Sequence, residues 1–491
     1  MPTSQPLSLD ADPSAAQLRA VLNAQRAAFL LEGPPTAQTR RDRINCLVQA
    51  VADNSAELTA AMNADFGNRP ELFSLMSDMA GVLPSVMKLN ENLETWMRDE
   101  VVAGSAETGL PTVLQHRPKG VVGVIGPWNF PLGLVIQPAA EALAAGNRVM
   151  IKFSDVPERT AEVFAEAIAE RFAPEEVYVC RGGLETAQAF SDLEFDHLFF
   201  TGSPAVGRRV AAAAGANLVP VTLELGGKNP VVVAPDADVN VAAERIAANR
   251  MINGGQVCLC PDYVFVPTDQ ADTFITAYRE HIGRFFPTYL GNPDVTTVIN
   301  DANYRRIVGL IQDAAAKGAE IITIAPAGET DSLPDPETRR IPPIIVLGVT
   351  DEMAIAREEI FGPVIAVFSY QDVTEAIDYM RARPHPLVAY WYGDDTADYQ
   401  TFLRLTTSGG VARNDIALHL RVDGAPFGGV GHSGMGYYHG KAGFDTFTHT
   451  RAITTNQLGV GIAPTMMPPY TDTVRDGLLE ILNTARSATS G

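Results

Sequence analysis

The stretch "HLFFTGSPAVGRRV" (His197–Val210) has the pattern of a strand, a tight turn and the start of a helix. Gly202 and Gly207 flank the turn, and Ser203 lies within it. The N-terminus of a helix offers N–H groups without helical partners and a partial positive charge, which suits a pyrophosphate. The spacing differs from the G-x-G-x-x-G fingerprint, so a nucleotide site and an ordinary strand-to-helix turn both stay open.

The same alternation extends outward from this stretch in both directions. Short β-branched runs alternate with Ala-rich helical segments from about residue 118 to 225, and again from about 229 to 411. This rhythm is typical of βαβ units on a parallel sheet that helices cover on both faces. Residues 14–99 instead have apolar residues at helical spacing, which predicts an N-terminal helical layer. We therefore predict an α/β fold with two α/β domains in series, and the Pro-rich segment 325–343 as a surface loop.

Length and charge narrow the class of protein. With 491 residues, 46% of them hydrophobic, the chain can build two or three packed units. A net charge of −21 argues against a nucleic-acid binder, because such binding depends on Lys and Arg that neutralise phosphates. Residues 1–17 have no signal-peptide pattern, and prolines or charges interrupt the apolar segments 121–151 and 459–491. A cytoplasmic protein without a membrane partner, with reduced cysteines, is expected.

Two of the four cysteines are one residue apart in "NGGQVCLCPDYV" (Asn253–Val264). A structural zinc site needs four donors, and no other Cys or His is nearby, so a metal site is disfavoured, as is a redox pair. Cys258 and Cys260 are then either small buried hydrophobic side chains or a nucleophile and its neighbour. The two glycines before the pair favour a turn whose N–H groups stabilise a thiolate and an oxyanion.

A carboxylate ends the predicted strand in "VTLELGGKNP" (Val221–Pro230). Open α/β sheets build their sites at the carboxyl ends of strands, and Glu224 lies at such an end. A single Glu is more often a surface group than a base. Glu224 becomes a candidate general base only in combination with Cys258.

The chain resembles the aldehyde dehydrogenase superfamily. Seven motifs occur in the order that the family has them, and they extend over most of the chain. The last motif is most similar to the branch that includes class 3, fatty-aldehyde and coniferyl aldehyde dehydrogenases. The motifs are "PWNFPL" (Pro127–Leu132), "IKFS" (Ile151–Ser154), "FTGSPAVG" (Phe200–Gly207), "LELGGKNP" (Leu223–Pro230), "GGQVCLCPDYV" (Gly254–Val264), "EEIFGPV" (Glu358–Val364) and "PFGGVGHSGMGYYHGKAGFDTFTHTR" (Pro426–Arg451).

The resemblance implies a Rossmann-like cofactor domain, an α/β catalytic domain and a small β arm for oligomerisation. It also implies a homodimer, which we expect rather than a tetramer. Residues 108–120 are expected to form a hairpin arm, and residues 443–453 a strand that pairs with it. The expected parts are the helical layer and NAD(P)-binding domain (1–225), the catalytic domain (226–413), a return segment with the oligomerisation strand (414–455) and a C-terminal tail (456–491).

The resemblance also implies catalytic roles. Cys258 matches the nucleophile of the family and Cys260 a position that varies, so Cys260 is expected to be a bystander. The side-chain amide of Asn129 and the backbone N–H of Cys258 are expected to hold the oxyanion. Glu224 matches the general base that activates water, and relatives that transfer the acyl group to coenzyme A lack this carboxylate. A free carboxylic acid is therefore the expected product.

Seven residues match cofactor contacts of the family. Asp155 stands where relatives often have Glu, and its charge disfavours a 2′-phosphate, so NAD is expected to be preferred with some use of NADP. No metal is expected. The matches are Lys152 and Asp155 for the adenosine ribose, Gly202, Ser203 and Gly207 for the pyrophosphate region, Glu359 for the nicotinamide ribose and Phe361 for the nicotinamide end.

The resemblance therefore implies NAD(P)-dependent oxidation of a hydrophobic aldehyde to its acid. The aldehyde is aromatic, such as coniferyl aldehyde, or a medium to long aliphatic one. Two alternatives stay open: a non-redox thiol esterase that uses the same cysteine, and a catalytically silent protein on the same fold. Loops build substrate pockets, so the sequence does not decide the natural aldehyde.

Overall fold

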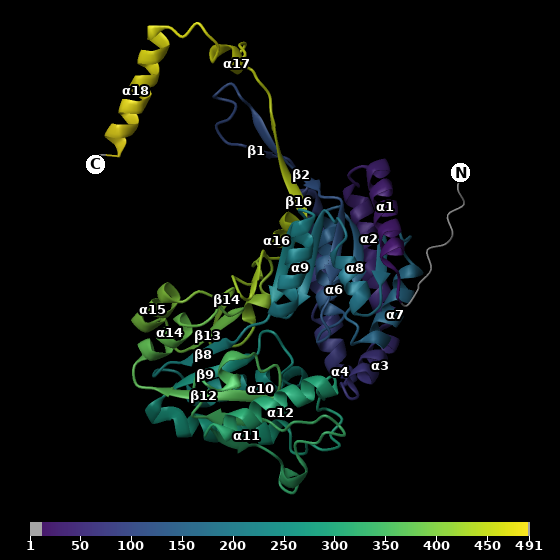
Figure 1. The fold of residues 1–491 in the computed structure, drawn as a ribbon, viewed down its shortest axis with the longest axis vertical. Coiled ribbons are helices and arrows are strands. Elements are labelled where there is room, and N and C mark those ends of the chain that lie inside the picture. Colours follow the sequence, from purple (N-terminus) through teal and green to yellow (C-terminus); the bar gives the residue numbers. More distant parts are fainter. Residues whose placement is uncertain (1–11, 490–491) are drawn as a thin grey trace. The chain divides into compact units, whose positions relative to one another are not determined.

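The structure is a computed structural model, and it describes residues 12–489 (Figure 1). Residues 1–11, which belong to the segment without a signal-peptide pattern, lie outside the described part. The chain divides into two compact units. The first comprises residues up to 97 and 117–449, and the second comprises residues 98–116 and 450 onward.

A six-stranded sheet forms the first half of unit 1, in the order β15-β7-β6-β3-β4-β5. Its five long strands are parallel, and only the short β15 is antiparallel to its neighbour. Nearly every strand residue is buried, as expected for a sheet with helices on both faces. The strands are β3 (Val121–Ile125), β4 (Arg148–Lys152), β5 (Val177–Cys180), β6 (His197–Gly202), β7 (Val221–Leu225) and β15 (Gly434–Met435).

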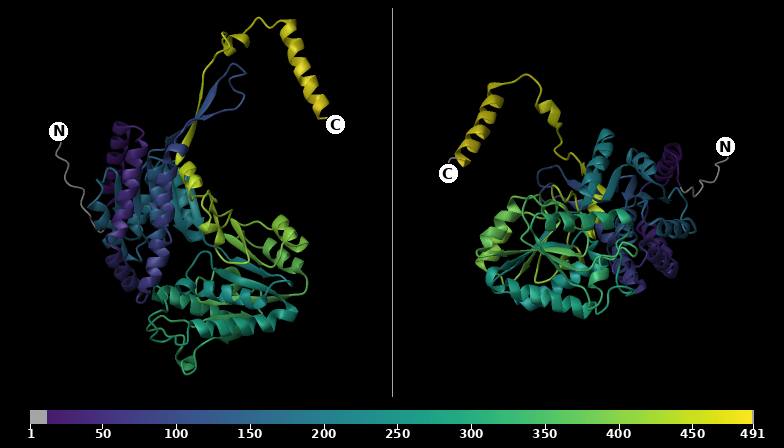
Figure 2. Two further views of the ribbon diagram at one scale, coloured as in Figure 1. Left: turned by 180° about the vertical axis from the view of Figure 1, so that it is seen from behind. Right: turned by 60° about the horizontal axis from the view of Figure 1, so that its bottom comes forward.

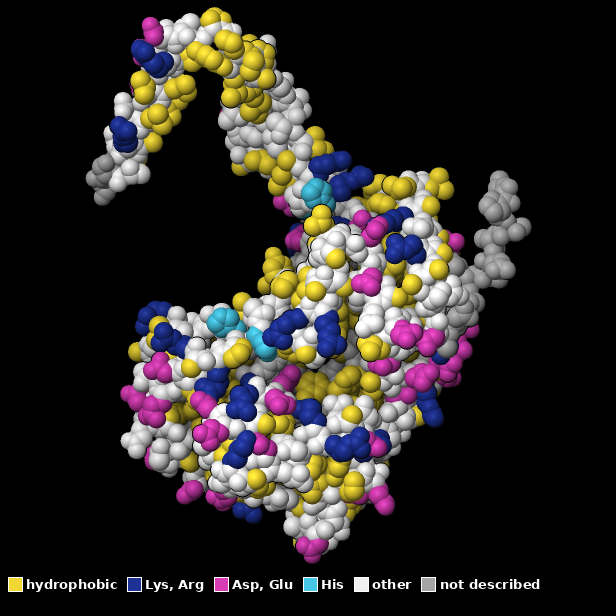
Figure 3. Space-filling view, in the orientation of Figure 1, with side chains coloured by type: hydrophobic (Ala, Val, Ile, Leu, Met, Phe, Trp, Pro, Cys, Tyr) yellow, Lys and Arg dark blue, Asp and Glu magenta, His cyan; other side chains and the backbone are white. Residues whose placement is uncertain are grey.

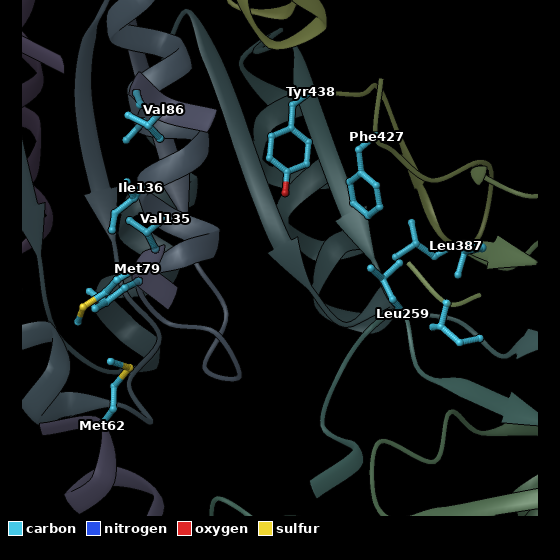
Figure 4. Close-up of a cluster of buried hydrophobic side chains, with 14 of the residues drawn as sticks. Met62, Met79, Val86, Val135, Ile136, Leu259, Leu387, Phe427 and Tyr438 are labelled. Carbon is cyan, nitrogen blue, oxygen red and sulfur yellow. The ribbon is translucent and has the colours of Figure 1, made fainter. Parts of the chain in front are cut away.

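Helices cover both faces of this sheet. One hydrophobic cluster joins α1, α8 and α9 to the strands. A larger cluster joins α2, α3, α5, α6 and α7 to the opposite face, and Figure 4 shows Met62, Met79, Val86, Val135 and Ile136 packed together within it. The helices are α1 (Ala15–Glu32), α2 (Ala37–Ala52), α3 (Ser55–Phe66), α5 (Leu83–Trp96), α6 (Gly133–Ala144), α7 (Glu158–Ala169), α8 (Leu184–Ser191) and α9 (Pro204–Ala216).

A seven-stranded sheet forms the second half of unit 1, in the order β10-β11-β12-β9-β8-β13-β14. All neighbours are parallel except β10 and β11. The strands are β8 (Asn229–Val233), β9 (Pro261–Pro267), β10 (Glu320–Thr323), β11 (Ile344–Leu347), β12 (Val364–Tyr370), β13 (Val388–Tyr392) and β14 (Gly410–Arg413). The helices are α10 (Val239–Met251), α11 (Ala271–Phe285), α12 (Asp301–Ala316), α13 (Ala354–Arg357), α14 (Val373–Arg381) and α15 (Ala397–Leu405), with 3-10 turns η2 (Ile252–Gly255), η3 (Thr268–Gln270), η4 (Thr330–Ser332) and η5 (Leu418–Arg421). A later helix, α16 (Lys441–Thr446), packs against α6 of the first half. Two parallel sheets with helices confirm the predicted α/β fold.

The segment Glu71–Trp96 is irregular. It begins as α4 (Glu71–Ser74), continues as a π-helix η1 (Leu75–Ala80) and ends as α5. It is long and apolar enough to cross a membrane, with a mean hydropathy of 1.2 over its most apolar window. Length and composition alone are weak evidence for a span, and this segment packs against α2 and α6 and holds the fully buried Asp78. Within unit 1, the segment Glu71–Trp96 is part of the layer of helices that covers one face of the six-stranded sheet.

Unit 2 is built on a three-stranded antiparallel ribbon, in the order β1-β2-β16 (Figure 2). The strands are β1 (Glu100–Val101), β2 (Thr112–Pro118) and β16 (Thr448–Thr454), and the helices α17 (Ile462–Thr465) and α18 (Asp472–Ala488) follow. The hairpin therefore begins upstream of the expected segment 108–120. The expected strand 443–453 is also wrong at its start: residues 441–446 are helical, because Phe444 and Phe447 at i and i+3 are both buried.

Candidate active site

The turn that carries Cys258 follows the end of α10. Asn253, Gly254 and Gly255 all have positive φ, at 52°, 63° and 77°. A Cβ at Gly254 would lie 2.8 Å from the Thr296 carbonyl oxygen, and one at Gly255 only 2.2 Å from that of Gly362. Both glycines are therefore required by conformation and by space. They allow the turn to pack tightly against its neighbours and to present the following cysteine.

The two cysteines of this turn differ in their surroundings. Cys258 is partly exposed, whereas Cys260 is buried and its Sγ lies 3.2 Å from the Asn249 carbonyl oxygen. Burial raises the pKa of the Cys258 thiol to about 12, and the nearby carboxyls of Glu359 and Glu224 add to this. Its own backbone N–H acts in the opposite direction. The thiol therefore needs a base before it can attack a substrate.

Asn129 is tied directly to this turn. It lies in the loop between β3 and α6, and its side-chain Nδ2 donates to the Gln256 carbonyl oxygen at 3.0 Å. The Asn253 side chain donates in turn to the carbonyl oxygens of Asn129 (3.0 Å) and Gln256 (3.2 Å). An amide nitrogen carries two N–H groups, so the bond to Gln256 uses only one of them. The loop of Asn129 and the turn of Cys258 thus form one hydrogen-bonded assembly.

Glu224 lies one residue before the end of β7, near the strand end that its pattern predicts, and only 4% of it is exposed. Neither carboxylate oxygen has a hydrogen-bond partner among the described residues. Burial raises the pKa of Glu224 well above its ordinary value. The buried phenol of Tyr438 has a pKa that the charges of Glu224 and Cys258 both raise, which places the three side chains in one neighbourhood. A desolvated acid beside a desolvated thiol is a combination typical of catalytic sites.

Glu359 and Phe361 lie close to this neighbourhood. A Cβ at Gly226 would come 2.1 Å from the Glu359 Oε2, so this carboxylate packs against the end of β7. Burial raises the pKa of Glu359 to about 8, and the charge of Asp262 adds to it, while the N–H of Gly227 lowers it. Phe361 has a φ of 50°, and its ring meets the Trp128 ring edge-to-face with centroids 5.3 Å apart.

Two cations fix the loop that carries Glu359. Arg306 donates to the carbonyl oxygens of Glu359 and Ile360, at 3.0 and 2.8 Å. Lys228 pairs with the buried Asp262 at 2.7 Å, and the other oxygen of Asp262 accepts from the Ile360 N–H. This support holds Glu359 in place although it lies outside regular structure.

The remaining matched residues lie at the carboxyl ends of β4 and β6. Lys152 is buried, and its Nζ donates to the carbonyl oxygens of Phe153 and Gly182, both at 2.6 Å. Asp155 is exposed, and its charge opposes the lowering of the Lys152 pKa that burial causes.

The turn after β6 has the features expected for a pyrophosphate seat. Ser203 caps α9, with its hydroxyl accepting from the Val206 N–H, and Gly202 and Ser203 are accessible to solvent. A Cβ at Gly207 would lie 2.6 Å from a methyl of Leu225, so this glycine lets α9 approach β7. These residues fit a dinucleotide whose phosphates lie at the start of α9. Over unit 1, Figure 3 shows acidic and basic side chains interspersed.

The structure thus brings Asn129, Glu224, Cys258, Glu359 and Phe361 together where strands of both sheets end. Lys152, Asp155, Gly202, Ser203 and Gly207 line the adjoining edge of the first sheet. Within residues 12–489 no group of three or more His, Cys, Asp or Glu side chains is placed to hold a metal ion. Sequence reasoning missed Asn253, Gln256 and Asn229, whose side chain donates to the Cys258 carbonyl oxygen at 2.7 Å. An Asn among glycines, a signal of left-handed backbone, could have identified the first.

Comparison with known proteins bears on this geometry. The model of the aldehyde dehydrogenase family matches residues 4–453. A probable coniferyl aldehyde dehydrogenase of Caulobacter vibrioides is 44% identical over 476 residues, which is 96% of this chain and 98% of that protein. A coniferyl aldehyde dehydrogenase of a Pseudomonas species is 40% identical over 97% of this chain and 98% of its own.

Solved structures are similar over most of the chain as well. Staphylococcus aureus AldH in a substrate-bound state has a TM-score of 0.86 and 32% identity, covering 94% of this chain and 99% of that one. A mutant of the indole-3-acetaldehyde dehydrogenase AldA of P. syringae, in complex with NAD+, has a TM-score of 0.80 and 26% identity. That comparison covers 91% of this chain and 90% of that one.

Proposed function

The chain belongs to the aldehyde dehydrogenase family, whose members use NAD(P), and on this premise we propose that it oxidises an aromatic, coniferyl-like aldehyde to the carboxylic acid. Two relatives similar over nearly the whole chain are named for coniferyl aldehyde, and this supports the substrate class. The observation that carries the proposed chemistry is the hydrogen bond from the Asn129 amide to the Cys258 turn, near Glu224, whose carboxylate has no hydrogen-bond partner in residues 12–489. The family match does not favour the thiol esterase alternative.

The first step is attack by Cys258. Because burial holds its pKa high, the thiol passes its proton to a base as the sulfur–carbon bond forms, and Glu224 is the buried carboxylate in that neighbourhood. The aldehyde C=O becomes an oxyanion. The second N–H of the Asn129 amide and the Cys258 backbone N–H stabilise it, and such a donor typically contributes about 3–4 kcal/mol.

NAD(P), when bound, accepts the hydride that leaves the aldehyde carbon. The remaining groups then act on a thioester at Cys258. Glu224 takes a proton from a water molecule, the water oxygen bonds to the acyl carbon, and the carbon–sulfur bond breaks. Cys258 leaves as a thiolate and the acid is released, so the product is a free carboxylic acid rather than an acyl thioester.

Residues at both ends of the site are proposed to hold the cofactor. Lys152 and Asp155 would contact the adenosine ribose, and the start of α9 with Gly202 and Ser203 would receive the pyrophosphate. Glu359 would hold the hydroxyls of the nicotinamide ribose, with Phe361 packed beside the ring. The exposed carboxylate of Asp155 supports a preference for NAD, because it repels a 2′-phosphate.

We further propose a homodimer in the cytoplasm. The two outer strands of the ribbon in unit 2 are short or largely exposed, and sheet edges of this kind pair readily with another chain. All four cysteines are free, as expected in a reducing compartment. Light scattering on the purified protein at several concentrations tests the dimer, and a mass of one subunit throughout would contradict it.

The experiment that tests the activity combines purified protein with NAD or NADP and one aldehyde. Coniferaldehyde, benzaldehyde, hexanal and decanal form the panel, and nicotinamide reduction is followed by absorbance. We expect coniferaldehyde to react fastest with NAD, Cys258→Ser to abolish reduction and Cys260→Ser to retain it. Cleavage of esters without any reduction of either cofactor would contradict the proposal.

A further inference from the structure

An ion pair lies buried in the helical layer, behind the Asn129 loop. Arg69 precedes α4, Asp78 lies in the π-helix η1, and both side chains are completely buried. The Arg69 Nη2 and the Asp78 Oδ2 are 2.6 Å apart. Single π-helical turns inside α-helices are frequent at functional sites.

The second oxygen of Asp78 caps another helix. Oδ1 accepts from the backbone N–H groups of Leu132 (3.2 Å) and Gly133 (3.1 Å), at the start of α6. The first N–H groups of a helix have no helical partner, and an N-cap side chain usually satisfies them. The residue at the N-cap of α6 is Leu132, which makes no side-chain cap. Asp78 supplies the missing acceptor from a different helix. The two N–H groups that it binds belong to the third and fourth residues after Asn129.

Arg69 holds the same loop through an aromatic ring. Its guanidinium carbon lies 4.8, 5.1 and 5.4 Å from the ring centroids of Phe66, Phe73 and Phe130. Phe130 directly follows Asn129 in the chain, and its ring also meets that of Phe73 at 6.3 Å. Burial lowers the pKa of Arg69, while the charge of Asp78 opposes this. The pair therefore contacts the loop at two places, the ring of Phe130 and the first N–H groups of α6.

The energetics of such a pair favour a positional role. Desolvating two charges costs about as much as their attraction returns, so a buried ion pair is weak evidence for stability. The pair instead orients the loop of Asn129: two backbone N–H groups, one carboxylate and one guanidinium hold the loop in a single arrangement. Asn253 also holds the Asn129 backbone, by donating to its carbonyl oxygen at 3.0 Å. The loop of Asn129 thus has two separate supports.

We propose that Arg69 and Asp78 are positioning residues that aim the Asn129 amide at the oxyanion. This rests on the proposed function, because it assigns the pair a part in the attack by Cys258. A displacement of about 1 Å at a reacting group can lower a rate by about a hundredfold. Since the oxyanion exists only after the attack, a misplaced amide slows the first half-reaction and leaves substrate and cofactor binding unchanged.

The test uses Asp78→Asn, which keeps the shape of the side chain, and Arg69→Lys, which keeps its charge. Matched controls are Glu176→Gln and Arg43→Lys, which alter another pair of unit 1 with side-chain atoms 3.0 Å apart. Stopped-flow absorbance measures the first turnover of nicotinamide reduction. We expect it to slow by about 10- to 100-fold in Asp78→Asn, with KM changed less than threefold and the controls near wild type.

A double-mutant comparison separates positioning from general damage. In an Asn129→Ala background, Asp78→Asn should add less than a twofold effect, because the group through which it acts is gone. An equal effect in both backgrounds, or an unchanged first turnover in Asp78→Asn, would overturn the inference. Arg69→Lys undergoes the same comparison if Asp78→Asn does not fold. A wild-type protein that reduces neither cofactor would instead refute the proposed function.

Discussion

Replacing Glu224 by glutamine tests the proposed chemistry most directly. Glutamine has nearly the same shape, and neither carboxylate oxygen has a partner to lose among the described residues, so the fold should tolerate it. The variant removes the base that activates water. General-base catalysis typically contributes about 10²- to 10⁴-fold, so kcat should fall by that factor, or about 2.7–5.4 kcal/mol in activation free energy.

The assay separates the two half-reactions. Stopped-flow absorbance should show a first turnover in Glu224→Gln that is slower than in wild type, because Glu224 also takes the thiol proton, and a steady state that is slower still. Intact-mass spectrometry should find the acyl group on Cys258. Because burial raises the pKa of Glu224, wild-type kcat should rise with pH as the carboxyl loses its proton, at a pH above the ordinary range of a glutamate. This rise should be absent in the variant.

A matched control is Glu141→Gln, which replaces another fully buried carboxyl of unit 1. Its kcat should stay within about threefold of wild type, because the proposed mechanism assigns no chemical step to Glu141. Wild-type kcat in Glu224→Gln would refute the reasoning. Loss of the first turnover without acyl enzyme would show that Glu224 acts only on the Cys258 thiol and that another group activates the water.

Three further predictions concern stability and cofactor choice. Gly255→Ala should destabilise the fold by more than about 2 kcal/mol in denaturant titration and abolish activity, because its Cβ would meet the Gly362 carbonyl. The control is Gly318→Ala, which also has positive φ but has open space around it, and it should cost about 1 kcal/mol. Burial raises the pKa of Glu141 to about 8, so wild-type stability should fall as pH rises from about 4.5 towards 8, and Glu141→Gln should remove this fall in thermal unfolding. Asp155→Asn should strengthen NADP binding by about tenfold in calorimetry, because it removes the charge that repels a 2′-phosphate. The exposed control Glu158→Gln should leave NADP binding unchanged. Equal effects of the two variants would contradict the role of Asp155.

Local signals in the sequence were sufficient for the parallel sheets. Most β-branched runs of 4–7 residues between Ala-rich segments became buried strands, although β10 is largely exposed, and Glu224 lies one residue before the end of β7. The start of the arm left no such signal, because β1 has only two residues, both exposed. The helix at 441–446 had one, the i, i+3 spacing of Phe444 and Phe447, but the strand pattern that follows obscured it.

The residues that support the site were harder to predict from the sequence. Asp78 lies 54 residues from the Leu132 N–H that it caps, and Asn253 lies 124 residues from the Asn129 carbonyl that it holds. No periodicity in the sequence reports pairs so far apart, and polar residues inside an apolar helical pattern are usually placed on its solvent face. The motifs locate groups that contact substrate and cofactor, whereas the residues that aim these groups become evident only from the fold.

The raised pKa values of Glu224 and Cys258 also constrain the order of the proton transfers in the site. If Glu224 and Cys258 were both ionised, two negative charges would lie close together in a buried region, so their titrations are coupled and one proton tends to remain with the pair. When the thiol attacks, that proton passes to Glu224, which is then a carboxylic acid and has no basicity towards water. Hydrolysis of the thioester requires the ionised form. A proton must therefore leave Glu224 for solvent between the two half-reactions, and the rise of kcat with pH reports this departure rather than the attack itself.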